Sequence, residues 1–135
     1  MVATCPGAAL ARCNAMSELK DRALPHRLRN GLAGLAQGWR RERSLRTQLL
    51  VSGTGVLVLW IAHVKPAWLL AVVALLAVAL AAELINAAFE ALLDRLHPDY
   101  DPEIGAVKDM SSAAVLVINL AAGAAFVAAL LARLT

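Results

Sequence analysis

The chain has 135 residues and a formal net charge of +3, with 60% hydrophobic and 17% charged residues. Soluble domains are less apolar, at roughly 45–50%, so this composition excludes an ordinary soluble domain and indicates a single-domain membrane protein. A nucleic-acid partner is also excluded, because no aromatic residues for base stacking are interleaved with the arginines.

Residues 1–25 show no periodic pattern and are predicted to form a cytoplasmic tail. Nine of the thirteen lysines and arginines precede the first long apolar run, and positive charge flanks membrane segments on their cytoplasmic side. Cys5 and Cys13 lie in this tail, where neither a disulfide nor a zinc site is expected. The nine basic residues are Arg12, Lys20, Arg22, Arg27, Arg29, Arg40, Arg41, Arg43 and Arg46.

Residues 26–44 are predicted to form an amphipathic helix. Leu28, Leu32, Leu35 and Trp39 are spaced at i, i+4, i+7 and i+11 and share one face, while the arginines lie off that face. Such a helix suits the membrane interface, with its apolar face toward lipid. A soluble helix packed on other protein is the alternative.

Three apolar stretches, 46–63, 67–93 and 110–132, are predicted to be transmembrane helices. A tight turn separates the first two, and a proline-containing loop over 97–109 separates the second from the third. The charge asymmetry predicts a cytoplasmic N-terminus and an external C-terminus for this multi-pass protein. A bundle of this kind belongs to the all-α integral membrane class.

The second stretch carries an acidic stripe. Glu83, Asn86, Glu90 and Asp94 are spaced at i, i+3, i+7 and i+11, so a helix would place them on one face. Acids inside a membrane are costly and are functional candidates by default. Glu83 would lie two turns deeper than Glu90, about 10 Å along the axis, where a lipid hydroxyl could reach it, and Glu90 would lie nearer water.

Glu42 and the pair Lys108–Asp109 would meet this stripe at the cytoplasmic boundary. Carboxylates converging with a lysine suit Mg²⁺ and phosphate oxygens, and one further carboxylate could act as a general base. The pattern therefore favours phosphoryl transfer to a lipid at the membrane surface. A proton or cation conductor, or a structural bundle with paired charges, remains open on these residues alone.

Two segments then point to a family. ELINAAFEALLDR (83–95) and VKDMSSAAV (107–115) closely resemble the prokaryotic diacylglycerol kinase family, whose pattern is E-[IL]-[IL]-N-x-A-[IF]-E-A-x-x-D, a short loop with tyrosine, and A-K-D-x-x-S-A-A-V. WRRERSLR (39–46) resembles its upstream W-x-x-E-x-x-[FL]-R element. The resemblance extends from about Gly31 to the C-terminus. One departure is Gln48, which stands where many members carry an acid or histidine.

The resemblance implies a small lipid kinase with an interfacial helix and three transmembrane helices, assembled as a homotrimer whose active sites are shared between subunits. It implies transfer of the ATP γ-phosphate to a lipid hydroxyl, with Mg²⁺ as the cofactor. Glu83 is then expected to be the catalytic base, and Glu42 and Glu90 the ligands of magnesium-ATP. The other expected contacts are Asn86, Tyr100, Lys108 and Asp109 with the nucleotide, Trp39 and Ser112 with the lipid, and Asp94 in support.

The resemblance further implies the bacterial inner membrane and a membrane-lipid environment. The kinase domain is expected to span residues 26–135. Diacylglycerol is the first choice of acceptor, and undecaprenol is the alternative. The core of the motif does not distinguish them, because both lipids present a primary hydroxyl at the same depth. For Asn86 and Asp94, a packing role at a helix–helix contact stands beside a direct catalytic one.

Overall fold

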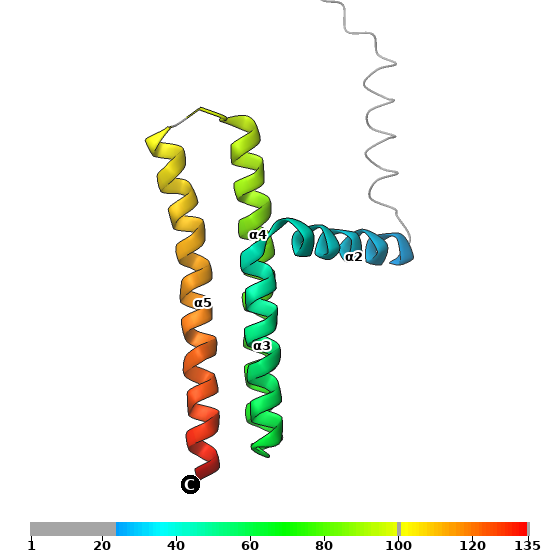
Figure 1. Ribbon diagram of the computed structural model, residues 1–135, viewed down its shortest axis with the longest axis vertical. Coiled ribbons are helices and arrows are strands. Elements are labelled where there is room, and N and C mark those ends of the chain that lie inside the picture. The colour runs from blue at the N-terminus through cyan, green and yellow to red at the C-terminus, as the bar shows by residue number, and fades with distance from the viewer. Residues whose placement is uncertain (1–23, 100, 135) are drawn as a thin grey trace, which may run out of the picture. The chain divides into compact units, whose positions relative to one another are not determined.

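The computed structural model describes residues 24–99 and 101–134. These residues form four α-helices and no strand: α2 (Leu24–Arg41), α3 (Arg43–Ile61), α4 (Pro66–Leu96) and α5 (Pro102–Leu134) (Figure 1). The all-helical prediction is confirmed. Most of the predicted tail, with Cys5 and Cys13, lies outside the described residues, and so does Tyr100.

The chain divides into two units after Gln37. In the first, residues 24–37 are helical and their leucines are exposed, with none of the residues of α2 buried. Leucines exposed along one face of a helix need another surface to cover them. The interfacial position of this helix remains a prediction.

The predicted helix over 26–44 is interrupted at Glu42. Its backbone is extended, with φ −102° and ψ 118°, so α2 ends at Arg41 and α3 begins at Arg43. The Glu42 N–H still donates to the Gly38 carbonyl at 2.8 Å, which completes the last turn of α2 before the chain changes direction. The Glu42 side chain makes no capping hydrogen bond to α3, so its carboxylate is available for other partners.

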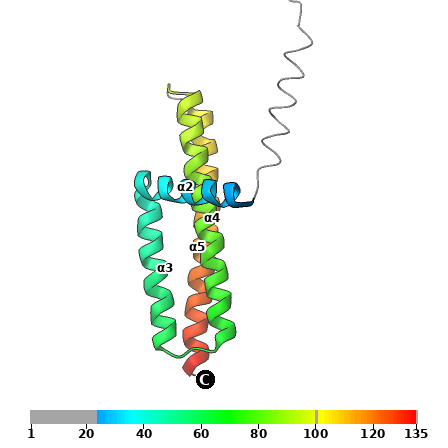
Figure 2. The same ribbon diagram turned by 90° about the vertical axis from the view of Figure 1, so that its right-hand side faces the viewer.

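In the second unit, α3, α4 and α5 run side by side with alternating direction (Figures 1 and 2). The contact between α4 and α5 is the most extensive, and α3 packs on α4 and more lightly on α5. All three are long and apolar enough to cross a membrane, as the three predicted spans require. Together with the composition, this makes the chain a membrane protein.

The loop before α5 is shorter than expected. α5 begins at Pro102 rather than near Met110, so Lys108 and Asp109 are helical and do not belong to a loop. The predicted loop over 97–109 was therefore too long, because a proline in the first turn of a helix has no hydrogen bond to lose and its fixed φ suits the helix. The Asp101 carboxylate accepts the backbone N–H of Glu103 at 2.8 Å, which stabilises that first turn.

The buried apolar core lies at the end of the bundle where α3 turns into α4. Leu59, Val64, Val72 and Ala129 are buried there and come from both sides of the turn and from α5. The Arg133 Nε donates to the Ala62 carbonyl at 2.9 Å, so the end of α5 is hydrogen-bonded to the end of α3. The acidic stripe lies toward the other end of α4.

A close approach at Gly38 brings the last turn of α2 against α4. A Cβ placed on Gly38 would lie 2.9 Å from Leu84 Cδ2 and 3.0 Å from Leu45 Cδ2. Both distances are shorter than ordinary van der Waals contact, so a side chain at this position would require the two leucine side chains to shift. Leu84 is the neighbour of Glu83, and the contact therefore carries Glu42 toward the acidic stripe.

Candidate active site

The acidic stripe lies on one continuous helix, α4, as its spacing predicted. Exposure increases along it: Glu83 is 7% exposed, Asn86 and Glu90 are half-buried, and the Asp94 side chain is 66% exposed. Glu83 is the one charged residue that is buried in the described part of the chain. Burial by protein therefore decreases along the stripe from Glu83 to Asp94, and the depth of these residues in the membrane stays a prediction.

A cavity of about 330 Å³ connects this stripe with the two neighbouring helices. It receives the carboxylates of Glu42, Glu83 and Glu90, and its volume is within the range of small-molecule sites. Its full lining is Glu42, Ser44, Glu83, Asn86, Ala87, Glu90, Ser112 and Val115. Three carboxylates that converge on one polar cavity repel one another in the absence of a cation.

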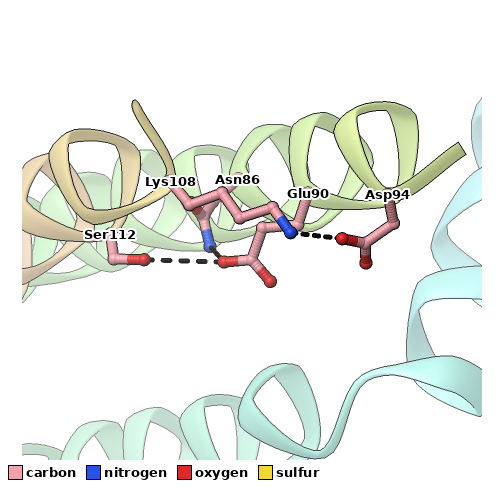
Figure 3. Close-up of polar contacts among 5 residues, drawn as sticks. All are labelled: Asn86, Glu90, Asp94, Lys108 and Ser112. Atoms are coloured by element: carbon pink, nitrogen blue, oxygen red, sulfur yellow. Dashed lines mark hydrogen bonds and ion pairs between the residues drawn. The ribbon is translucent and has the colours of Figure 1, made fainter. Parts of the chain in front are cut away.

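Glu90 is held by two neutral donors (Figure 3). The Asn86 Nδ2 donates to Glu90 Oε1 at 2.9 Å, one helical turn away on α4. The Ser112 hydroxyl of α5 donates to the same oxygen in a long contact of 3.5 Å. Among the described residues, no hydrogen bond is made to Glu90 Oε2, so this oxygen remains available to a ligand of the cavity.

Asn86 has a second polar atom that is not satisfied. Its Oδ1 is buried and has no hydrogen-bond partner among the described residues, although its Nδ2 is bonded to Glu90. A buried carbonyl oxygen without a partner costs about 1–3 kcal/mol. Because Asn86 lines the cavity, a donor or a cation bound there would satisfy this atom.

Lys108 of α5 forms an ion pair with Asp94 of α4 (Figure 3). The Lys108 side chain is 31% exposed, and neither residue lines the cavity. The sequence grouped Lys108 with Asp109, but Asp109 is exposed and has no such contact in the described chain. The structure thus gives Lys108 a carboxylate partner next to the cavity and beyond Glu90.

The acidic residues of the cavity do not form a metal site by themselves. Within residues 24–99 and 101–134, no group of three or more Asp, Glu, His or Cys is arranged to hold a metal by itself. Mg²⁺ usually takes one or two carboxylates and completes its shell with water and substrate phosphates. Glu42, Glu90 and the unpartnered Asn86 Oδ1 are oxygen donors of the right kind on one cavity.

The remaining predicted residues lie at different positions. Ser112, which the resemblance placed beside the lipid, contacts Glu90 and lines the cavity. Trp39 is 44% exposed on α2 and does not line it. Tyr100 cannot be placed, because it lies outside the described residues.

The sequence missed Ser44, Ala87 and Val115 in the cavity wall. Ser44 could have been predicted, because its hydroxyl lies two residues after Glu42 within the motif-like segment 39–46. Ala87 and Val115 could not, because small apolar residues are abundant throughout the spans.

The sequence matches the model of a known protein family. The family model described as prokaryotic diacylglycerol kinase matches residues 29–132, which is most of the chain and includes every described residue of the cavity. No curated protein matches the sequence.

Proposed function

The chain belongs to the prokaryotic diacylglycerol kinase family, and on that basis we propose that it phosphorylates diacylglycerol with magnesium-ATP at the cytoplasmic face of the bacterial inner membrane. Family membership makes the chain a small lipid kinase of the membrane. The observation that carries the finer proposal is the nearly buried Glu83 carboxylate, which shares one polar cavity with the carboxylates of Glu42 and Glu90.

In the proposed reaction, Glu83 is the general base. Its carboxylate accepts the proton of the lipid hydroxyl while the hydroxyl oxygen forms a bond to the γ-phosphorus of ATP. The bond between that phosphorus and the bridging oxygen to the β-phosphate breaks, and ADP leaves with the electron pair. Burial of Glu83 supports this role, because it excludes bulk water as a competing acceptor of the phosphoryl group.

Glu90 and Glu42 would bind the magnesium ion that accompanies ATP. Mg²⁺ supplies charge neutralisation for the phosphate oxygens, which is the main requirement of phosphoryl transfer. The hydrogen bonds from Asn86 and Ser112 fix the orientation of Glu90 without neutralising its charge. Lys108, once released from Asp94, would reach the phosphates from α5, and Ser112 would lie at the border with the lipid.

The proposal extends to topology and assembly. The basic N-terminal third indicates a cytoplasmic N-terminus, and three spans then place the C-terminus outside. Trp39 and the exposed leucines of α2 would rest in the interface beside the lipid substrate. We also propose a homotrimer, in which Tyr100 and Asp109 complete the nucleotide site.

The test is phosphate transfer from γ-labelled ATP, in mixed micelles that offer diacylglycerol and undecaprenol separately, with and without Mg²⁺. Magnesium-dependent label in phosphatidate supports the proposal. Label mainly in undecaprenyl phosphate would replace the acceptor and leave the site residues as assigned. Label in neither lipid, from folded protein, would contradict the kinase and favour a conductor or a structural bundle.

A further inference from the structure

Two polar contacts join α4 and α5 on successive helical turns. Ser112 meets Glu90, and one turn nearer the connection between the helices Lys108 meets Asp94 (Figure 3). Each pair is offset from the other by four residues on both helices, or about 6 Å along the axes. The same stretch of α5 therefore faces Glu90 with a neutral hydroxyl and Asp94 with an ammonium.

Because of this arrangement, a positive charge compensates the carboxylate of Asp94 but not that of Glu90. Glu90 accepts hydrogen bonds from the uncharged donors of Asn86 and Ser112, so its negative charge is not compensated by the described residues. Asp94 is compensated by Lys108. A carboxylate that is to bind a cation must not already be paired with an ammonium, because the two cations would compete for the same oxygens.

The Lys108 side chain is long enough to compete with a metal cation for Glu90. Its ammonium is a compact charge on a flexible four-carbon stem, and Glu90 lies one turn away from its present partner. Glu90 is also less exposed than Asp94, and charge attraction is stronger where water is partly excluded. If Asp94 carried no charge, the ammonium would shift toward Glu90.

We propose that Asp94 is a positioning residue, which holds Lys108 off Glu90 so that the Glu90 carboxylate stays available for the cation of magnesium-ATP. The inference rests on the proposed function, in that Glu90 is taken as a magnesium ligand and Lys108 as a phosphate contact. It gives the Lys108–Asp94 pair a role in the reaction that its contribution to stability would not explain, since exposed ion pairs contribute little.

The test uses Asp94→Asn, which retains the shape of the side chain and loses its charge. The half-saturating Mg²⁺ concentration, measured at saturating ATP, is expected to rise about fivefold, equivalent to about 1 kcal/mol of competition. The kcat at saturating Mg²⁺ should change much less. Asp94→Glu should restore the wild-type Mg²⁺ dependence, and Asp99→Asn, an exposed acid beyond the end of α4, serves as the matched control.

The double variant Asp94→Asn/Lys108→Met separates positioning from a structural role. It lacks the competing ammonium, so its half-saturating Mg²⁺ concentration should return to the wild-type value even where its rate is low. An unchanged Mg²⁺ dependence in Asp94→Asn would overturn the proposal. A double variant that needs as much Mg²⁺ as Asp94→Asn would overturn it as well.

A second readout makes the inference independent of lipid turnover. Mn²⁺ binding to the solubilised protein in the presence of ATP and without lipid, followed by electron paramagnetic resonance, should weaken in Asp94→Asn and recover in the double variant. If wild-type protein transfers no phosphate but the Mn²⁺ affinities follow this order, the proposed kinase is wrong and the positioning role holds. If wild-type protein is active and the Mn²⁺ affinities do not differ, the kinase holds and the positioning role is wrong.

Discussion

Replacing Glu83 by glutamine tests the proposed reaction at the atom that accepts the proton. The amide has the shape of the carboxylate but cannot accept a proton from the lipid hydroxyl. A positioned general base contributes roughly 10²–10⁴-fold to a rate, so turnover is expected to fall by at least a hundredfold, or about 3 kcal/mol in the barrier. The KM for ATP should change little, because Glu42 and Glu90 remain on the cavity.

Because Glu83 is buried, the loss of turnover in Glu83→Gln can be distinguished from a loss of folded protein. Glu83 is 7% exposed, and removing a charge from such a site leaves stability unchanged or raises it. The thermal midpoint in detergent should therefore not fall, while the transfer of label from γ-labelled ATP to lipid does. Glu103→Gln, at an exposed acid in the first turn of α5, is the control and should retain the wild-type rate.

A Glu83→Gln protein that kept its rate would refute the assignment of the base. It would leave Glu83 as a buried acid without a role in the chemistry, as the structural alternative requires. A protein that lost its activity and its thermal midpoint together would equally contradict the reasoning, because the carboxylate would then be needed for folding.

Three further outcomes concern stability, each measured as the thermal midpoint in detergent. Gly38→Ala should gain little stability or lose some, because the close contact of its Cβ with Leu84, at 2.9 Å, offsets the better helix propensity of alanine. Gly34→Ala should gain up to about 1 kcal/mol, because the space around Gly34 is open among the described residues. His63→Gly should stabilise by about 1 kcal/mol, because His63 has φ 52° and an L-residue is disfavoured there. Arg133→Ala should cost about 1–2 kcal/mol by removing the hydrogen bond that joins α5 to the end of α3, and Arg133→Lys should recover part of it.

The acidic stripe was predictable because it depends on one helix alone. Residues at i, i+3, i+7 and i+11 share a face of any α-helix, whatever packs against it. The structure confirms one continuous helix, along which burial by protein decreases from Glu83 to Asp94. The three membrane helices were predictable on the same local grounds, from length and apolar content.

The break at Glu42 could not be predicted in this way. Nothing in its neighbourhood is a proline or a strong capping signal, and the leucine pattern continues up to Trp39. What ends α2 is tertiary: Gly38 packs against Leu84 and Leu45, and the chain must then turn to follow α4. Tertiary contacts of this kind override local propensity.

The sequence could not predict the partner of Lys108, again because a tertiary contact decides it. This contact depends on the register between α4 and α5, and that register depends on where α5 begins. Read as a loop residue, Lys108 could approach any of the acids at the boundary. With the helix starting at Pro102, Lys108 and Ser112 are four residues apart on one face, so one must meet Asp94 where the other meets Glu90.

The two contacts depend on the same register, so a shift of α5 would change both of them together. A shift of α5 by one turn along α4 would place the ammonium opposite Glu90 and the hydroxyl opposite Asn86. The carboxylate would then be neutralised before any cation arrived, and Lys108 would compete with the Asn86 amide for its oxygens. The short connection and the proline at its end set where α5 begins, and in this register Asp94, rather than Glu90, has a cationic partner among the described residues.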